Sequence, residues 1–374
     1  MVLDKRNRKG LVWERFHASP CAGGPLARTL DELAALSGVS RSTVSRVING
    51  GPVSEETRRR VTEVLEETGF RPNAAARTLA SGRSGVVGVV IHVSPHLLFQ
   101  DPYFTALLQG VTDALAERAI GMMLWLGNRS KQETLDQILW MGMLDGVIVT
   151  ADQLDDPLVD GLLASNLPTV LIGHRRADAN ASYVDIDNVA AADLMTTHLI
   201  GSGRRRIGHI TGRRRTVAAE DRIVGYTNAM TRAGLSTDGL VVEGDFREAS
   251  GRLGSLELLD RGIDAIFCAN DATAAGALES IHARGLSVPD DVAVAGFDDL
   301  DFVAHLNPPL TTIRQGVQAQ GVEAARTLLD LLRDRGRTPR RVILPTELVI
   351  RRSTVGGRKE GEPVEPAVDT VAAS

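Results

Sequence analysis

The sequence is poor in cysteine and aromatic residues and has no long apolar run, and these shortages limit what the protein can be. Only Cys21 and Cys268 are present, too few for a framework of disulfides, which favours a reducing compartment. No stretch reaches the roughly 18 apolar residues of a membrane span. The N-terminus also lacks the apolar segment of a secretory signal. The sequence therefore predicts a globular protein of the cytoplasm.

Patterns that carry catalysis or hold metals are absent as well. No histidine pair lies at metal-ligand spacing beside a cysteine or carboxylate cluster, and His92 and His96 straddle Pro95, which is typical of a loop. No glycine-rich phosphate loop precedes a helix, and no serine nucleophile elbow occurs. We expect neither an enzyme nor a cofactor.

Charge is unevenly distributed along the chain. The net charge of −5 by itself argues against a nucleic-acid binder. Yet residues 1–84 carry 14 Lys and Arg against 9 Asp and Glu, whereas the remainder carries 28 against 38. A basic N-terminal part on an acidic body is the distribution expected when DNA binding is confined to one end of the chain.

The stretch from Leu33 to Asn49 predicts two short helices joined by a tight turn. Gly38 suits the left-handed backbone of such a turn, and Ser40 suits the cap of the second helix. That helix buries its apolar residues and keeps Arg, Ser and Asn outside, a face that suits the edges of bases in a major groove. Helical pairs of this kind also occur in ordinary helical cores, so this stretch alone leaves both interpretations open.

Further motifs follow in a specific order. A third helix is expected from Ser54 to Gly69, and its start reads Val53-Ser54-Glu55-Glu56-Thr57-Arg58. Next come Arg71-Pro72-Asn73 and a short helical run that includes Leu79-Ala80. Together with the helix-turn-helix, these motifs resemble the lac repressor family of bacterial transcription regulators.

The resemblance implies a hinge helix after Pro72. About nine residues are too few for a helix to persist alone in water, so we expect it to form only when two copies pack on DNA. Its exposed Leu79 would then part a base step in the minor groove. A plain linker of helical composition is the alternative. The DNA-contacting residues that we predict are Ser40, Arg41, Ser42, Thr43, Arg46, Asn49, Asn73, Arg77, Leu79 and Ala80.

From residue 85 onward, short apolar runs alternate with helical patterns. Such runs indicate parallel sheets covered on both faces, and roughly seven to ten strands suit two lobes better than one. The resemblance implies a two-lobed, periplasmic-binding-protein-like core with crossings near Gly173, Asp298 and Val317. The strands that we predict are Val86–Val93, Met122–Leu126, Gly146–Thr150, Thr169–Ile172, Ile207–Ile210, Ala265–Cys268 and Val292–Ala295.

Ligands of open parallel sheets bind beyond the carboxyl ends of the strands. Planar polar groups located there can bind neighbouring hydroxyls in pairs, and aromatic faces stack on a sugar ring or a purine. Each such residue also has a plain structural reading, as a turn, cap or packing residue. Carried over by position, the resemblance implies that the effector contacts Tyr103, Phe104, Arg222, Phe246, Asn270, Asp298 and Gln315.

One position departs from the family pattern. Many members carry Asp after the strand that corresponds to Thr169–Ile172, where this chain has Gly173. The lost carboxylate argues against the family's commonest monosaccharides and leaves room for a longer ligand.

The sequence thus favours a sequence-specific repressor that is controlled by a small carbohydrate. A purine-like corepressor, or a sugar-binding protein without a DNA function, are the alternatives. We expect a homodimer on a near-palindromic operator, because no leucine heptad follows Arg352 to build a larger assembly.

The predicted class is α/β, with a helix-turn-helix headpiece before a doubly wound core. The predicted parts are a disordered extension (1–28), the helix-turn-helix domain (29–72), the hinge helix and linker (73–84), the core (85–352) and a disordered tail (353–374). Within the core, we expect a first lobe of residues 85–172 and 299–317 and a second lobe of residues 173–298 and 318–352.

Overall fold

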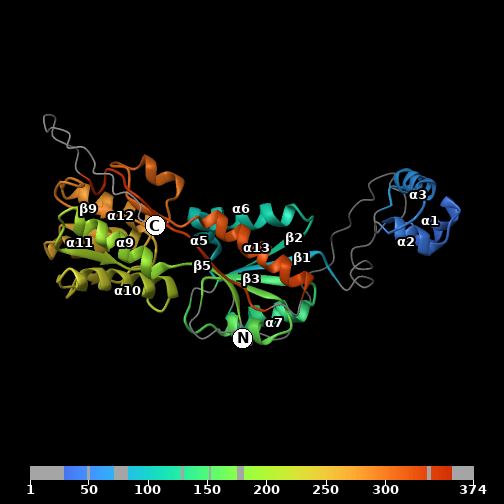
Figure 1. Cartoon of the computed structure of the whole chain (residues 1–374), viewed down its shortest axis with the longest axis horizontal. Helices are drawn as coiled ribbons and strands as arrows, with labels where there is room; N and C mark the ends of the chain where they lie inside the picture. The colour runs from blue at the N-terminus through green and yellow to red at the C-terminus, as the bar shows by residue number, and fades with distance from the viewer. Residues whose placement is uncertain are drawn as a thin grey trace, which may run out of the picture. The chain divides into compact units, whose positions relative to one another are not determined.

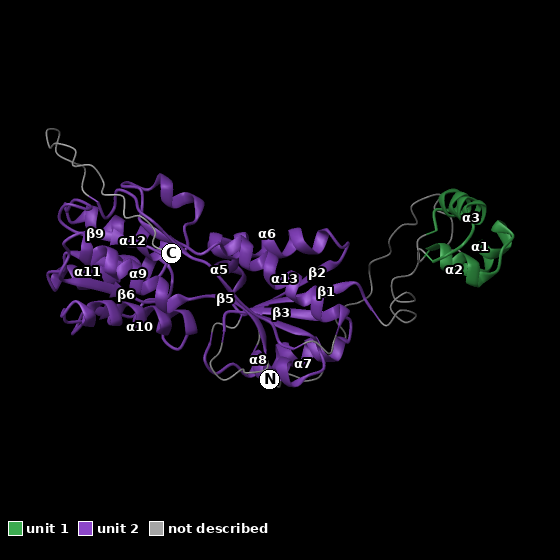
Figure 2. Cartoon of the chain, in the orientation of Figure 1, with its two compact units in different colours: residues 1–82 green, residues 83–374 purple. Residues whose placement is uncertain are grey.

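In a computed structural model, the structure describes residues 29–48, 51–70, 83–127, 130–150, 153–174, 181–334 and 338–355. The chain divides into two compact units, residues 1–82 and residues 83–374 (Figure 2). No helix within the described ranges is long and apolar enough to cross a membrane. The predicted extension (1–28) and most of the predicted hinge and tail lie outside the described residues.

The first unit contains the three helices predicted for a helix-turn-helix. They are α1 (Leu30–Ser37), α2 (Arg41–Ile48) and α3 (Glu55–Thr68). Thr29 and Glu32 form a capping box at the start of α1, and Gly38 ends that helix at φ 61°. Leu33, Val44 and Val61 fill the small core between the helices. This confirms the predicted headpiece.

The first lobe of the second unit is built on a six-stranded parallel sheet in the order β11-β5-β4-β3-β1-β2. Alternate strand residues feed two cores, one beneath each face. Figure 1 shows α13 beside α6 on one face, and α7 lies on the other. The strands are β1 (Val86–Ile91), β2 (Gly121–Leu126), β3 (Gly146–Thr150), β4 (Thr169–Ile172), β5 (Ser182–Ile186) and β11 (Arg341–Leu344); the helices are α5 (Pro95–Gln100), α6 (Pro102–Ala116), α7 (Lys131–Met141), α8 (Pro157–Ala164) and α13 (Val317–Arg333).

The second lobe has a four-stranded parallel sheet in the order β7-β6-β8-β9, again with a core on each face. A two-stranded antiparallel pair, β10 and β12, packs on this lobe. The strands are β6 (Ile207–Ile210), β7 (Val241–Val242), β8 (Ala265–Cys268), β9 (Ala293–Ala295), β10 (Thr312–Arg314) and β12 (Glu347–Val349); the helices are α9 (Asn188–Gly201), α10 (Val217–Arg232), α11 (Glu248–Asp260), α12 (Asp271–Ala283) and the short 3-10 helix η1 (Asp301–His305).

The predicted lobe boundaries were wrong. Because β5 and β11 both join the first sheet, these two strands belong to the first lobe and not, as predicted, to the second. Helix α13 packs against α6, so it too belongs to the first lobe, not the second as predicted. The segment 299–314 belongs to the second lobe, where β10 pairs with β12. The crossings therefore lie after β5, between β10 and α13, and between β11 and β12.

The predicted tail also begins too early. Ser353 and Thr354 are buried, at 0% and 2% exposed. The Ser353 hydroxyl donates to the Val294 carbonyl oxygen at 2.6 Å and accepts the Thr311 N–H at 2.8 Å. Ser353 thereby ties the end of the core to the edge of the second lobe, so the ordered core extends beyond residue 352.

Candidate functional site

The second helix of the headpiece presents a polar outer face. Ser40 caps it, because its hydroxyl accepts the Thr43 N–H at 3.2 Å. Val44 and Val47 point into the core, 0% and 9% exposed. The predicted base-reading residues Arg41, Ser42 and Arg46 are exposed, and Thr43 is half-buried. The fold therefore brings the described members of the predicted DNA set onto one helix.

Arg41 has a partner within the headpiece. Its Nη1 lies 3.4 Å from Asp31 Oδ2, and both side chains are about two-thirds exposed, at 66% and 68%. An exposed pair of this kind contributes about 0–1 kcal/mol, so Arg41 can exchange it for DNA at small cost. The other predicted DNA residues, Asn49, Asn73, Arg77, Leu79 and Ala80, lie outside the described residues.

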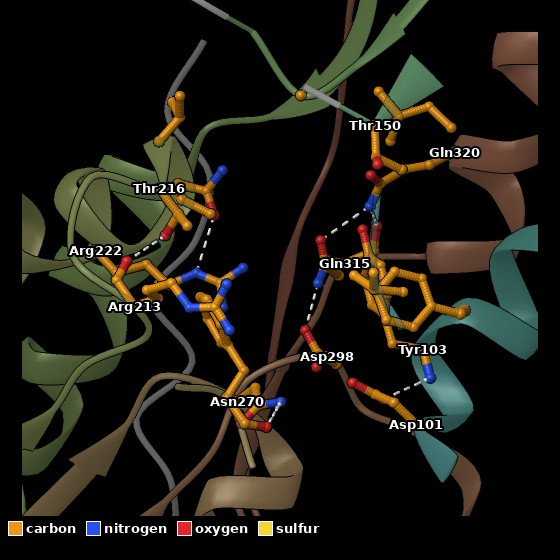
Figure 3. A pocket seen from close by; sticks show the side chains of 18 of the residues that line it. Asp101, Tyr103, Thr150, Arg213, Thr216, Arg222, Asn270, Asp298, Gln315 and Gln320 are labelled. Carbon is orange, nitrogen blue, oxygen red and sulfur yellow. Dashed lines mark hydrogen bonds between the residues drawn. The ribbon is translucent and has the colours of Figure 1, made fainter. Parts of the chain in front are cut away.

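A pocket lies between the two lobes of the core, at the carboxyl ends of their strands. It encloses about 1150 Å³, including the part open to solvent. Figure 3 shows polar side chains from both lobes converging on it. All of the predicted effector-contacting residues line this pocket: Tyr103, Phe104, Arg222, Phe246, Asn270, Asp298 and Gln315.

Sequence reasoning missed several of the polar residues that line the pocket. They are Asp101, Thr150, Asp185, Asn188, Arg213, Thr216, Asp245 and Gln320. Thr150 ends β3, so the strand-end rule would have found it had it been applied to every predicted strand, whereas Asn188 follows β5, which the sequence did not predict. Gln320 lies inside α13, where no sequence pattern marks it.

Arg222 of α10 is buried, at 4% exposed, and hydrogen bonds fix its guanidinium group in place. Its Nε donates to Asn188 Oδ1 at 3.0 Å, and its Nη1 donates to the Ala269 carbonyl oxygen. The guanidinium carbon lies 3.6 Å from the centre of the Phe297 ring, a favourable cation–π geometry. Burial lowers the pKa of Arg222, and the nearby Asp298 carboxylate opposes this shift. Nη2 has no hydrogen-bond acceptor within the described part of the chain, so it remains available to a ligand.

Asp298 lies at a strained corner, with φ 119°. Its N–H donates to the Ile313 carbonyl oxygen at 2.8 Å, which fixes the backbone. Burial raises the pKa of its carboxyl well above the ordinary value, with a further rise from Asp271, while Arg222 lowers it. An oxygen acceptor removed from water in this way binds a ligand hydroxyl more strongly than an exposed one does.

Asp298 also begins a hydrogen-bonded chain that crosses between the lobes. Gln315 Nε2 donates to Asp298 Oδ1, and Gln320 Nε2 donates to Gln315 Oε1 at 2.9 Å. Asp298 belongs to the second lobe, Gln315 to a crossing and Gln320 to α13 of the first lobe. A ligand that contacts Asp298 is thereby connected to the first lobe through side chains alone.

The first lobe contributes an aromatic wall. Tyr103 and Phe104 meet edge to face, with ring centres 5.3 Å apart, and both also pack on the first-lobe core. Asp101 caps α6, the helix that carries both rings, because its Oδ1 accepts the Tyr103 N–H at 3.0 Å. Burial raises the pKa of Asp101. The two aromatic residues therefore serve both the packing of the lobe and the lining of the pocket.

Asn270 has a structural role beside the predicted one. Its Oδ1 caps α12 by accepting the Thr273 N–H at 3.0 Å and the Thr273 hydroxyl at 2.6 Å. Its Nδ2 donates to the Phe246 carbonyl oxygen at 2.9 Å. The Asn270 side chain therefore both caps α12 and lines the pocket.

Gly173, the position singled out in the sequence, follows β4 and lines the pocket. Gly173 has φ 89°, which favours glycine. The next residue, His174, places Nδ1 at 2.6 Å from Asp185 Oδ2, and its N–H donates to the same oxygen at 2.9 Å. A carboxylate is therefore still present at this end of the pocket, but it comes from β5.

The lobes also touch close to the pocket, next to the lining residue Thr216. The Leu154 N–H donates to the Arg215 carbonyl oxygen at 3.0 Å, and the Arg215 guanidinium pairs with Asp155. Lys131 supports this loop by donating to Asp156 at 2.7 Å and to Gln153 at 2.6 Å. No cluster of metal-ligating side chains occurs within the ranges that the structure describes.

Comparison with known families finds one match in each of the two units. Residues 29–73 match the family described as bacterial regulatory proteins, lacI family. Residues 196–354 match the periplasmic binding protein-like domain.

Individual proteins match over most of the chain. The HTH-type transcriptional regulator CelR of Thermobifida fusca is 39% identical over 332 residues, which cover 87% of this chain and 98% of CelR. The structure of a CelR–cellobiose complex has a TM-score of 0.69 at 38% identity, covering 87% of this chain and 99% of that one. The lac repressor dimer bound to operator and the anti-inducer ONPF has a TM-score of 0.79 at 28% identity, covering 88% and 100%.

Proposed function

This chain belongs to the lacI family of bacterial regulatory proteins and is a DNA-binding transcriptional regulator, and we propose that it is a repressor controlled by a short carbohydrate, of the size of cellobiose, bound between its lobes. Because its target is the bacterial chromosome, we expect it to act in the cytoplasm. The observation that carries the carbohydrate proposal is the lining of the pocket. The lining combines fixed planar donors and acceptors with aromatic rings.

The polar groups suit neighbouring hydroxyls. Arg222 presents Nη2 as a donor, and Asp298 presents a buried carboxylate as an acceptor. Both are oriented before a ligand arrives, so binding needs little reorganisation. The apolar face of a sugar ring fits against Phe246 or Tyr103. The absence of a side chain at Gly173 supports a ligand of more than one ring.

The headpiece supplies specificity for DNA. We propose that Arg41, Ser42 and Arg46 contact base edges in the major groove, where Arg binds guanine through two hydrogen bonds. Ser40, Thr43 and Asn49 would position the helix on the backbone. We further propose that Asn73, Arg77, Leu79 and Ala80 contact the minor groove as a hinge helix in a homodimer, on a near-palindromic operator.

Control of DNA binding would pass through the lobes. A ligand held by Arg222 and Asp298 changes the balance between open and closed lobes, because its affinity for the two arrangements differs. The chain from Asp298 through Gln315 to Gln320 carries this change to α13 of the first lobe. The contact between Leu154 and Arg215 also joins the two lobes, close to the pocket. A difference of about 1–3 kcal/mol between the two states suffices for switching.

A purine-like corepressor is the second candidate. The edge-to-face pair of Tyr103 and Phe104, 5.3 Å between ring centres, together with Phe246, would suit a flat base. The buried pair of Arg222 and Asp298 favours hydroxyls instead. A sugar-binding protein without a DNA function fits less well, because the headpiece is a complete helix-turn-helix.

A thermal-shift screen distinguishes these ligands. We expect cellobiose or a related disaccharide to raise the melting temperature of the full chain, because a ligand bound only by the native state stabilises it. A shift with hypoxanthine or guanine and none with sugars would favour the corepressor. A gel shift with operator-containing DNA, with and without the ligand found, then establishes whether that ligand changes DNA binding.

A further inference from the structure

We propose that Gly212 is a positioning residue that sets the pocket's selectivity for a two-ring sugar, because it provides the space in which the Phe246 ring lies. The inference rests on the proposed function, since it refines which carbohydrates the pocket accepts. Gly212 follows β6 by two residues and is buried.

The ring of Phe246 occupies the volume that a side chain at Gly212 would need. A Cβ at Gly212 would lie 1.9 Å from Phe246 Cζ, 2.2 Å from Cε2 and 2.4 Å from Cε1. Carbon atoms in contact are normally about 3.5–4.0 Å apart. Gly212 itself is not among the residues with positive φ, so its backbone is one that any residue adopts. Glycine is therefore required at 212 by the neighbouring ring, and not by the turn.

The backbone around Phe246 leaves the ring little freedom to retreat. Phe246 has φ 67°, a conformation that is strained for a residue with a side chain. Asn270 Nδ2 holds its carbonyl oxygen at 2.9 Å. Two residues earlier, a Cβ at Gly244 would lie 2.3 Å from the Thr211 carbonyl oxygen, so this segment passes in close contact over the end of β6.

The pocket is the open space beside the ring. Phe246 lines the pocket and Gly212 does not, so the ring lies between the glycine and the ligand. A methyl group at 212 pushes the ring toward the ligand and narrows the space between Phe246 on the second lobe and Tyr103 on the first. A ligand of two rings needs more of this space than a ligand of one. Gly212 therefore determines selectivity through Phe246 without contacting the ligand.

A double-mutant cycle on the full chain tests this, with cellobiose and glucose as probes in calorimetry. We expect Gly212→Ala to weaken cellobiose binding by about tenfold or more and glucose binding much less, since one methyl group in a pocket discriminates by roughly 10–200-fold. In a Phe246→Ala background, adding Gly212→Ala should change cellobiose affinity less than about twofold, because the clashing ring is gone. Gly201→Ala is the matched control, since a Cβ at Gly201 meets nothing within 4 Å.

Melting curves without sugar provide a second readout that does not depend on the ligand. Gly212→Ala should lower the melting temperature when Phe246 is present, and the double variant should melt within about 2 °C of Phe246→Ala. A double variant that melts well below Phe246→Ala would overturn the inference, even if Gly212→Ala alone folds poorly. The inference would also be overturned if the wild type binds cellobiose and the Gly212→Ala variant binds it equally tightly. A wild type that binds neither cellobiose nor any related disaccharide would instead overturn the proposed function, and the selectivity with it.

Discussion

The headpiece and the core recognise their partners with polar side chains in opposite environments. Arg46, a proposed base reader, is exposed on α2, whereas Arg222, the proposed hydroxyl donor, is 4% exposed on α10. DNA brings a strong negative charge, so exposed cations suffice to attract it. A neutral sugar offers only hydroxyls, and its hydrogen bonds become strong only where water is excluded and the partners are already fixed.

The environments also differ in what holds the side chains in place. On α2, the outer residues are anchored by a helix that itself rests on a small core of a few valines and leucines. In the pocket, Arg222 is fixed by Asn188 and Ala269, and Asp298 by Gln315. The two functions should therefore respond to different perturbations, and each can be removed without the other.

The largest effect expected is the loss of ligand binding in the core alone. Asp298→Ala should weaken carbohydrate binding by about a hundredfold or more, because it leaves the ligand's buried hydroxyl without its acceptor. Operator binding without ligand should stay within about twofold of the wild type. Calorimetry and fluorescence anisotropy measure the two affinities. Asp301→Ala, an exposed carboxylate on η1, is the control. If Asp298→Ala responds normally to the sugar, the proposed site is wrong.

Salt should separate the two units next. Raising the salt concentration from 50 to 200 mM should lower operator affinity by about a hundredfold or more, because phosphate contacts release counterions. Carbohydrate affinity should change less than about twofold over the same range, since the ligand is neutral and Arg222 is buried. Anisotropy and calorimetry in matched buffers provide the comparison. A steep salt dependence of sugar binding would mean that exposed charges such as Arg213 hold the ligand.

Substitution on the headpiece should have the converse effect of Asp298→Ala. Arg46→Ala should cost specific DNA binding about 1–3 kcal/mol while leaving sugar affinity unchanged. Arg59→Ala is the matched control, because Arg59 is exposed on α3 and pairs only weakly with Glu63 at 3.8 Å. Operator affinity is measured by anisotropy against a scrambled duplex. Equal losses for both variants would show that charge, and not the identity of the position, accounts for the effect.

The smallest effect concerns the stability of the core under acid. His209 is fully buried between the rings of Tyr226 and Phe267, and its Nδ1 donates to the Phe267 carbonyl oxygen at 2.8 Å. Burial lowers the pKa of His209 from 6.5 to about 4. Below pH 6.5 the unfolded chain therefore takes up a proton that the folded chain refuses, and His209 destabilises the fold increasingly down to about pH 4.

The buried Asp271 changes the stability of the fold in the opposite direction as the pH falls. Burial raises its pKa to about 7, so between pH 7 and about 4 the folded chain holds the proton more tightly, which adds stability as the pH falls. A difference between variants isolates the histidine. His209→Asn should lose stability at pH 7 through lost packing, but regain up to about 2 kcal/mol relative to the wild type at pH 5. Melting curves at both pH values measure this; a difference that does not depend on pH would contradict it.

The sequence was informative where a pattern is local and failed where a contact is distant. Continuous apolar runs predicted β3, β4, β6 and β8 with the observed bounds. Strand β5, Ser-Tyr-Val-Asp-Ile, mixes polar and apolar residues and was missed, so the lobe boundary was placed too early. Part of the pocket lining was anticipated because strand ends and family motifs coincide there, but Gln320, inside α13, was missed. The dependence of Phe246 on Gly212 joins segments 34 residues apart and has no signature along the chain.

Reciprocity between the two units is the most direct test of the account. The affinity for the identified carbohydrate is measured by calorimetry on the free protein and on the protein saturated with its operator. Because coupling between two sites is reciprocal, the sugar affinity should change by the same factor by which the sugar changes operator affinity, in the range of about 5–150-fold. Identical sugar affinities in the presence and absence of operator would contradict the claim that the pocket controls DNA binding.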